Sequence, residues 1–191
     1  MKKIFFDTEF TGLHQTTKLI SIGLIAEDGQ TFYAESCSFQ DGFQHESDEK
    51  WADENLLPHL KFYGKEVNVR AYNNSMLSCD NPLSVSEVFG EEWLIKDSLG
   101  EWLSRFGKVE LWSDCLAYDF VLFNQLWGHA FKIPENVYYI PFDICTMFQL
   151  KGIDPDINRE EFAGMTDGAE KHNALWDARV IRACYEKLMG E

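Results

Sequence analysis

A short apolar run that ends in two carboxylates, within residues 3–13, restricts the fold of this chain more than any other segment. The aliphatic and aromatic residues at 4–6 favour a strand buried within a sheet. Side chains alternate across a strand, so Asp7 and Glu9 project from the same face. Burial and mutual repulsion penalise two adjacent carboxylates unless a cation lies between them. The segment therefore predicts a strand that carries a divalent metal site.

Acidic residues elsewhere in the chain decide whether the pair is a metal site or only a solvated strand end. An isolated Asp-x-Glu pair is usually a solvated strand end. Asp119, however, begins a predicted helix after a strand, where its carboxylate can point back toward the edge of the sheet. The alternative for Asp119 is an acid that only favours the helix dipole. Asp177 lies one turn into the last predicted helix and is the fourth candidate ligand.

His172 stands close to this fourth acid but cannot share a helix face with it. Five helical positions turn by about 500°, which leaves the two side chains about 140° apart. His172 is therefore expected to precede the helix, in a loop, with Asn173 as the cap. A histidine in such a position is ordinarily just exposed. The neighbouring Asp177 is what distinguishes His172 from such a histidine.

Composition limits the class of protein. A chain of 191 residues suits one domain spanning 1–191. No apolar run approaches the roughly 20 residues of a membrane span, and the N-terminus does not resemble a signal peptide. Five scattered cysteines without a Cys-x-x-Cys pair favour reduced thiols and a cytoplasmic location. The formal charge of −15 argues against a protein that coats nucleic acid, but allows one that grips a single chain end through metal ions.

Periodicity and turn residues predict three antiparallel strands followed by alternating helices and strands. The second and third strands are expected at 19–27 and 31–39, and further strands at 109–112 and near 138–142. Helices are expected at 51–57, 95–106, 118–127, 144–150 and 173–189. Segments 72–82 and 151–168 are predicted to be loops. The pattern indicates an α/β domain with a mixed sheet.

Taken together, the candidate residues reproduce the signature of the DEDDh (DnaQ-like) family of 3'-5' exonucleases. The chain resembles this family over nearly its whole length. The segment Phe6-Asp-Thr-Glu-Phe-Thr-Gly-Leu13 is similar to the Asp-x-Glu strand of the family, and His172 to Asp177 has the His-x4-Asp spacing. Asn173 stands where a tyrosine would mark the sister DEDDy group. The resemblance implies a ribonuclease H-like fold, with a mixed central sheet flanked by helices.

The resemblance also implies roles for individual residues. Two divalent cations, Mg²⁺ or Mn²⁺, would be held by Asp7, Glu9, Asp119 and Asp177. Asp7 would bridge both cations, with Glu9 and Asp177 at one and Asp119 at the other, mainly through water. His172 would accept the proton of the attacking water. The terminal nucleotide would be gripped by Phe10, Thr11, Gly12 and Leu13. For Phe10 and Leu13, ordinary core packing is an equal alternative.

Within the family, the segments around Trp112, Asp119 and Trp127 are similar to the polyadenylate-specific exoribonuclease AS enzymes, as is the stretch from Trp51 to Pro58. This similarity implies a homodimer that removes nucleotides from the 3' end of single-stranded RNA, with a bias toward adenosine tails. A 3'-5' exodeoxyribonuclease is a second hypothesis, because the two-metal chemistry does not distinguish the sugars. A non-catalytic nucleic-acid-binding module is a third, and retention of costly clustered acids speaks against it.

Several other polar residues are left outside the predicted site. Asp114 is the nearest of them, five residues before Asp119, but it falls at the exit of the strand. The remaining excluded acids are Asp143, Asp154, Asp156 and Asp167. His14 is a candidate for contact with phosphate because it follows the first motif. His45, His59 and His129 are interpreted as surface residues, and the acidic segment 46–54 has no assigned role.

Overall fold

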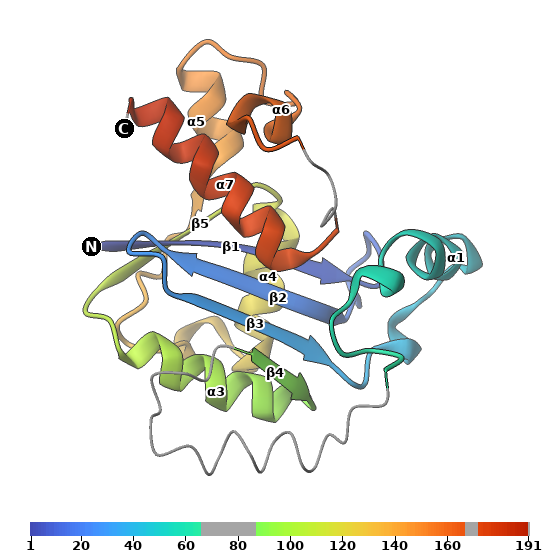
Figure 1. The fold of residues 1–191 in the computed structure, drawn as a ribbon. Coiled ribbons are helices and arrows are strands. Elements are labelled where there is room, and N and C mark those ends of the chain that lie inside the picture. Colours follow the sequence, from blue (N-terminus) through green and yellow to red (C-terminus); the bar gives the residue numbers. More distant parts are fainter. Residues whose placement is uncertain (66–86, 167–171, 191) are drawn as a thin grey trace.

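The computed structural model describes residues 1–65, 87–166 and 172–190, and a six-stranded sheet in the order β4-β3-β2-β1-β5-β6 forms its centre (Figure 1). The strands are β1 (Lys2–Phe10), β2 (Leu19–Ala26), β3 (Thr31–Ser36), β4 (Glu87–Gly90), β5 (Val109–Ser113) and β6 (Phe142–Asp143). β1, β2 and β3 are antiparallel neighbours, whereas β5 is parallel to β1, β6 to β5 and β4 to β3. The predicted mixed sheet of ribonuclease H-like type is thus confirmed.

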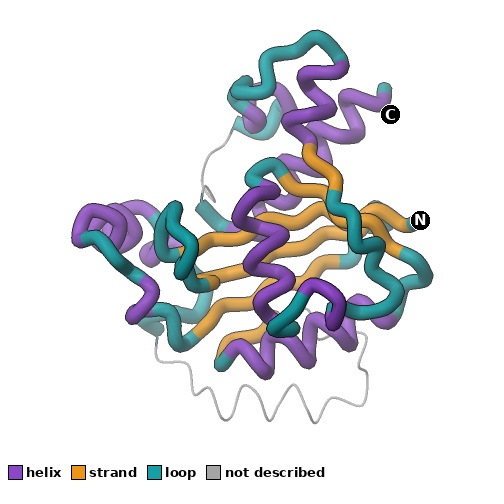
Figure 2. The backbone as a smooth tube through the Cα atoms, turned by 180° about the vertical axis from the view of Figure 1, so that it is seen from behind, coloured by secondary structure: helices purple, strands orange, loops and turns teal. Residues whose placement is uncertain are grey.

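Helices cover both faces of this sheet. They are α1 (Glu46–Asn55), α3 (Glu92–Ser104), α4 (Leu116–Leu126), α5 (Ile144–Leu150), α6 (Arg159–Ala163) and α7 (Ala174–Met189). α7 crosses β1 and β2 on one face, and the view from behind shows α4 across the other (Figures 1 and 2). Side chains alternate between the two faces along β1. Ile4 and Phe6 therefore pack in the apolar cluster under α3 and α4, whereas Phe5 packs in the cluster under α5 and α7.

A smaller apolar cluster holds α1 beside the ends of β1 and β2. Ala52 and Leu56 pack there against Ile20 and Phe39. The chain after α1 is tied down by the buried carboxylate of Glu35, which accepts hydrogen bonds from the backbone N–H groups of residues 61–63. A buried carboxylate satisfied by several backbone donors fixes a segment that has little regular structure of its own. α1 therefore has a defined position relative to β1.

Most predicted elements agree with the structure, but one helix and one loop differ from it and one strand was not predicted. The predicted cap at Asn173 is confirmed, since its side chain accepts from N–H groups of the first turn of α7. Asp143 caps α5 in the same way by accepting from the N–H groups of Cys145 and Thr146. The helix predicted at 51–57 in fact spans Glu46–Asn55. β4 was not predicted, because its four residues are too short for a periodicity signal.

The predicted loop at 151–168 was also wrong in part, since it contains α6. Asn158 caps this helix by accepting from the N–H of Glu161, and Gly164 ends it in the left-handed conformation with φ 74°. The loop predicted at 72–82 lies outside the described residues. Within the described ranges, no helix combines the length and the apolar character that crossing a bilayer requires.

Candidate active site

β1 carries the first pair of acids on the face covered by α7. Asp7 is buried and Glu9 partly buried at the end of this strand. Asp7 lies opposite Gly23 of the antiparallel strand β2. A Cβ at Gly23 would be only 2.2 Å from the backbone nitrogen of Leu175, so the first turn of α7 rests directly on β2. This close approach brings carboxylate oxygens of Asp7, Glu9 and Asp177 within 4.8 Å of one another.

Asp119 reaches the same point from the opposite face. Thr8 points away from Asp7 because side chains alternate along β1, and its N–H and hydroxyl donate to Oδ1 of Asp119 at 3.2 and 2.6 Å. The hydroxyl of Ser113, at the end of β5, donates to Oδ2. Asp119 is fully buried in the first turn of α4. Its carboxylate therefore points back toward the sheet, as its position in the sequence predicted.

Asp114, which the sequence analysis left out, belongs to the cluster. Oxygens of Asp7, Asp114 and Asp119 also lie within 4.8 Å of one another. Phe5 pairs with Trp112 in parallel register, so two residues further along each strand Asp7 and Asp114 reach the same level. The sequence analysis did not anticipate this position of Asp114, because the register cannot be derived from spacing within one strand. Asp7 is thus common to two groups of three carboxylates.

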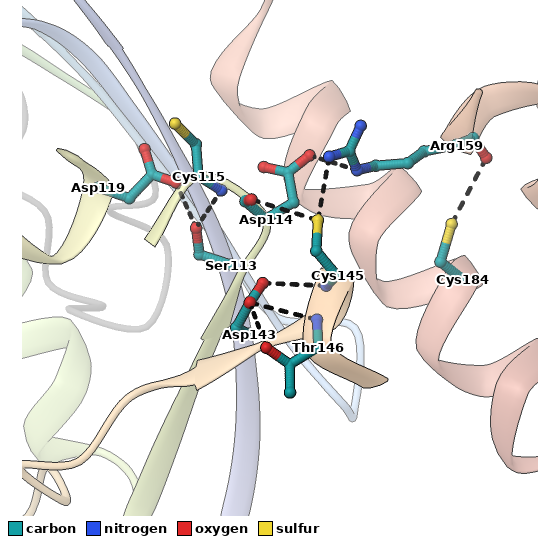
Figure 3. A network of polar contacts seen from close by, with 9 residues as sticks. All are labelled: Ser113, Asp114, Cys115, Asp119, Asp143, Cys145, Thr146, Arg159 and Cys184. Carbon is teal, nitrogen blue, oxygen red and sulfur yellow. Dashed lines mark hydrogen bonds and ion pairs between the residues drawn. The ribbon is translucent and has the colours of Figure 1, made fainter. Parts of the chain in front are cut away.

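A network around Arg159 supports Asp114 (Figure 3). The Nε of Arg159, at the start of α6, lies 2.8 Å from Oδ2 of Asp114. The Nη2 donates to the thiol sulfur of Cys145 at 3.1 Å, and that thiol donates to the backbone carbonyl of Asp114 at 3.4 Å. A cavity of about 370 Å³ lies here, lined by both Arg159 and Asp177. α6 therefore places the guanidinium group of Arg159 against Asp114 of the acidic cluster.

Burial and mutual repulsion strongly perturb these acids. Burial, followed by the charges of Asp119 and Asp177, raises the pKa of Asp7 well above its usual range. Burial and Asp177 raise the pKa of Glu9 to about 8. Burial raises the pKa of Asp119 to about 7, against the hydrogen bonds from Ser113 and Thr8, which lower it. Full ionisation at neutral pH thus requires a neutralising cation.

The donor set fits hard divalent cations. All ligand candidates are carboxylate oxygens, which Mg²⁺ and Mn²⁺ prefer over nitrogen or sulfur donors. The two overlapping groups share Asp7, which is the arrangement expected for two neighbouring ions with one bridging ligand. Each group contains at least one buried carboxylate with a raised pKa, so a cation would relieve an existing electrostatic cost.

A cavity of about 520 Å³ opens beside Glu9. One wall is the predicted nucleotide-binding segment, residues 10–13, continued by His14. Leu13 is 73% exposed, which excludes the core alternative for that residue. Phe10 has both characters: its ring stacks on Tyr118, with centroids 5.1 Å apart, and packs against the main core, yet it also lines the cavity.

The opposite wall comes from α1, which the sequence analysis had not connected with the site. His45, Asp48, Trp51 and Ala52 line it. Gly12 permits the two walls to approach, because a Cβ there would lie 2.7 Å from Oδ2 of Asp48. His45 is exposed, as predicted, and it also lines this cavity. No pattern in the sequence connected α1 with β1, since the contact depends on tertiary packing.

His172 lies in the turn before α7, as predicted. Its backbone φ is 63°, a conformation that no other non-glycine residue adopts among those that the structure describes. Its ring meets that of Trp51 edge to face, with centroids 5.2 Å apart and an interplanar angle of 84°. His172 therefore stands between the start of α7 and the α1 wall of the larger cavity. The segment before it, 167–171, lies outside the described residues.

Comparisons with known proteins identify a family and several similar proteins. The model of the Rv2179c-like 3'-5' exoribonuclease domain matches residues 2–189. The 3'-5' exoribonuclease Rv2179c of Mycobacterium tuberculosis strain H37Rv is 29% identical over 179 residues, covering 93% of this chain and 87% of the relative, and MT2234.1 of strain CDC 1551 matches equally. The nuclease domain of 3'hExo, a DEDDh family member solved with rAMP, aligns over 99% of this chain and 92% of its own, with 12% identity and a TM-score of 0.49.

Proposed function

The chain belongs to the family of Rv2179c-like 3'-5' exoribonuclease domains, and from this premise we propose that it removes nucleotides one at a time from the 3' end of single-stranded RNA. The observation that carries the proposal is the sharing of Asp7 between two carboxylate groups at the mouth of a cavity of nucleotide size. The M. tuberculosis relatives are named as 3'-5' exoribonucleases, which supports RNA rather than DNA as the substrate.

Two divalent cations, Mg²⁺ or Mn²⁺, are the proposed cofactors. Asp7, Glu9 and Asp177 would hold one, and Asp7, Asp114 and Asp119 the other. Bound there, the cations supply Lewis acidity for attack of water on the phosphodiester. The hydrogen bonds from Thr8 and Ser113 orient the carboxylate of Asp119 in advance. Ligands held by such partners need no rearrangement when a cation arrives.

His172 is the proposed general base. Water attacks the phosphorus of the last phosphodiester, its proton passes to an imidazole nitrogen of His172, and the bond to the 3' oxygen of the preceding ribose breaks. The last nucleotide leaves as a 5'-monophosphate. Imidazole is the side chain most often used as a general base at neutral pH. Its location beside Trp51 at the rim of the larger cavity supports the role.

The larger cavity is the proposed subsite for the terminal nucleotide. Leu13 offers an exposed apolar side chain, and Trp51 of the opposite wall is 47% exposed. Apolar and aromatic surfaces of this kind stack on bases without requiring a particular sequence. Recognition through one chain end is compatible with the net charge of −15, which disfavours long contacts with the phosphate backbone.

A direct experiment compares 5'-labelled single-stranded RNA and DNA of one sequence in Mn²⁺. The proposal predicts a ladder that shortens from the 3' end of the RNA, and no cleavage when that end carries a phosphate. D7N is the matched inactive control. Faster loss of the DNA would indicate a 3'-5' exodeoxyribonuclease, and internal cuts in the blocked RNA would contradict an exonuclease.

Three further properties are proposed from the sequence resemblance. Adenosine-rich tails are the preferred substrate, a homodimer is the functional form and the protein acts in the cytoplasm. Competition between A-, U- and C-homopolymers of equal length tests the first. Equal rates on all three would remove the base preference while leaving the exoribonuclease activity in place. Light scattering of the purified protein tests the second, since a single chain has a mass of 22.1 kDa.

A further inference from the structure

A large aromatic side chain is exposed at the rim of the larger cavity. Trp51, on α1, leaves 47% of its surface accessible and lines this cavity. Burying an indole is strongly favourable, so its incomplete burial suggests a role outside core packing. Its ring is in edge-to-face contact with the ring of His172, which comes from a segment 121 positions later in the chain.

The backbone of His172 requires outside support. A non-glycine residue at φ 63° is strained, and such conformations persist only where the surroundings determine them. From the C-terminal side, the support is the cap: Asn173 accepts hydrogen bonds from the N–H groups of Leu175 and Trp176 at 3.1 and 3.2 Å. This cap fixes the start of α7, but it does not orient the imidazole ring.

Trp51 is itself well placed to orient that ring. α1 is anchored by Ala52 and Leu56, which are buried against β2. Asn55 donates to the backbone carbonyl of Trp51 at 2.9 Å. An edge-to-face contact between aromatic rings has a defined geometry and contributes about 0.5–1.5 kcal/mol beyond burial. A fixed indole can therefore restrict the rotamers of a ring that sits on a short turn.

We propose that Trp51 is a positioning residue for His172: the edge-to-face contact of the two rings holds the imidazole at the mouth of the larger cavity. This inference rests on the proposed function, because it assumes that His172 accepts a proton during hydrolysis. In this proposal, a side chain of α1, which is not part of the sheet, orients the catalytic histidine. The sequence signature, which includes only residues of β1, α4 and the start of α7, contains no member of this helix.

The kinetic test is a double-mutant cycle on RNA cleavage. W51A is expected to lower kcat about 10- to 100-fold, which is part of the roughly 10²–10⁴-fold that a general base contributes. W51F keeps an aromatic edge-to-face partner and should retain most of the rate. W51A in the H172A background should lower kcat by less than 3-fold, because the residue through which Trp51 acts on kcat is gone, whereas the loss of its stacking surface should raise KM in both backgrounds. W93A, which removes a 62% exposed tryptophan on α3, is the control and should keep the rate of the unmodified chain.

An equal loss of kcat from W51A with and without His172 would overturn the proposal, since Trp51 would then not act through His172. A second readout does not depend on activity. The ring current of Trp51 should shift the imidazole C–H resonance of His172, identified by its absence in H172A, and W51A should return it toward the random-coil position. An unchanged resonance would also overturn the proposal. If the resonance moves but the unmodified chain cleaves no RNA, the proposed function fails and the contact between the rings stands.

Discussion

The start of α7 packs against β2 at a glycine that has no chemical role. Gly23 of β2 lies opposite Asp7, and a Cβ there would be 2.2 Å from the backbone nitrogen of Leu175. Ordinary contact begins near 3.4 Å. In G23A, the start of α7 must therefore move away from the sheet by about 1.2 Å, because the atoms in the way are backbone atoms that no rotamer change can remove.

The displacement acts on both stability and catalysis. Inserting a methyl group into a tightly packed contact costs about 1–3 kcal/mol, which corresponds to a decrease in Tm of about 2–4 °C per kcal/mol for a chain of this size. Asp177 and His172 both depend on the start of α7. A misplacement of about 1 Å in a catalytic group can cost about 100-fold in rate. G23A is therefore expected to lose about 100-fold in kcat and to bind Mn²⁺ more weakly.

G100A is the matched control for this variant. Gly100 lies inside α3, and a Cβ there meets nothing within 4 Å. Replacing a helical glycine with alanine should stabilise the protein by about 0.5–1 kcal/mol, without any change in rate. Thermal unfolding, Mn²⁺ calorimetry and RNA cleavage measure the three effects. A G23A protein with unchanged Mn²⁺ affinity and rate would refute the claim that contact between α7 and β2 sets the position of Asp177.

Other predictions concern the acids and the base. D7N should abolish high-affinity Mn²⁺ binding in calorimetry together with activity, because Asp7 belongs to both carboxylate groups. D114N should weaken one of two Mn²⁺ binding events and leave the other; two unaltered events would exclude Asp114 as a ligand. H172A should keep Mn²⁺ affinity and lose about 10²–10⁴-fold in kcat, and an unchanged rate at neutral pH would contradict its role. Without metal, stability should fall as pH rises from about 4 to 8, since the folded state raises the pKa of Glu9 to about 8 and that of Asp119 to about 7 and so binds more protons than the unfolded chain. The Tm in a chelator, followed across this range, should fall, whereas Mn²⁺ should remove most of the decrease.

Local rules were sufficient for much of the fold and for the signature acids. Alternation along a short apolar strand predicted that Asp7 and Glu9 share a face, and helical periodicity predicted that His172 precedes α7. The cap at Asn173 followed from the same reasoning. Each of these inferences uses residues within a few positions of one another. Backbone geometry is nearly the same in every protein at that range, so these inferences transfer from sequence to structure.

The features that sequence reasoning missed depend on contacts between distant segments. Asp114 joins the cluster only because β5 runs parallel to β1 in one particular register. α1 becomes a wall of the larger cavity only because a small apolar cluster that includes Phe39 docks it beside β1. Arg159 lies beside Asp114 because it begins α6, a short helix in the acid-rich segment that was predicted to be a loop. Neither strand register nor helix docking has a local signature in a single sequence.

Electrostatics and packing act against each other at the contact between α7 and β1. Packing draws the two elements together, because Gly23 lets the first turn of α7 lie on the sheet and apolar residues of both elements share one core. Repulsion separates them, because Asp177 comes from α7 while Asp7 and Glu9 come from β1. A cation between these carboxylates converts the repulsion into attraction at the same place. Metal binding and docking of α7 are therefore thermodynamically linked, and the element that completes the metal site also carries His172 at its start. In the proposed mechanism, a cation held by these carboxylates would therefore also stabilise the position of His172, the proposed base.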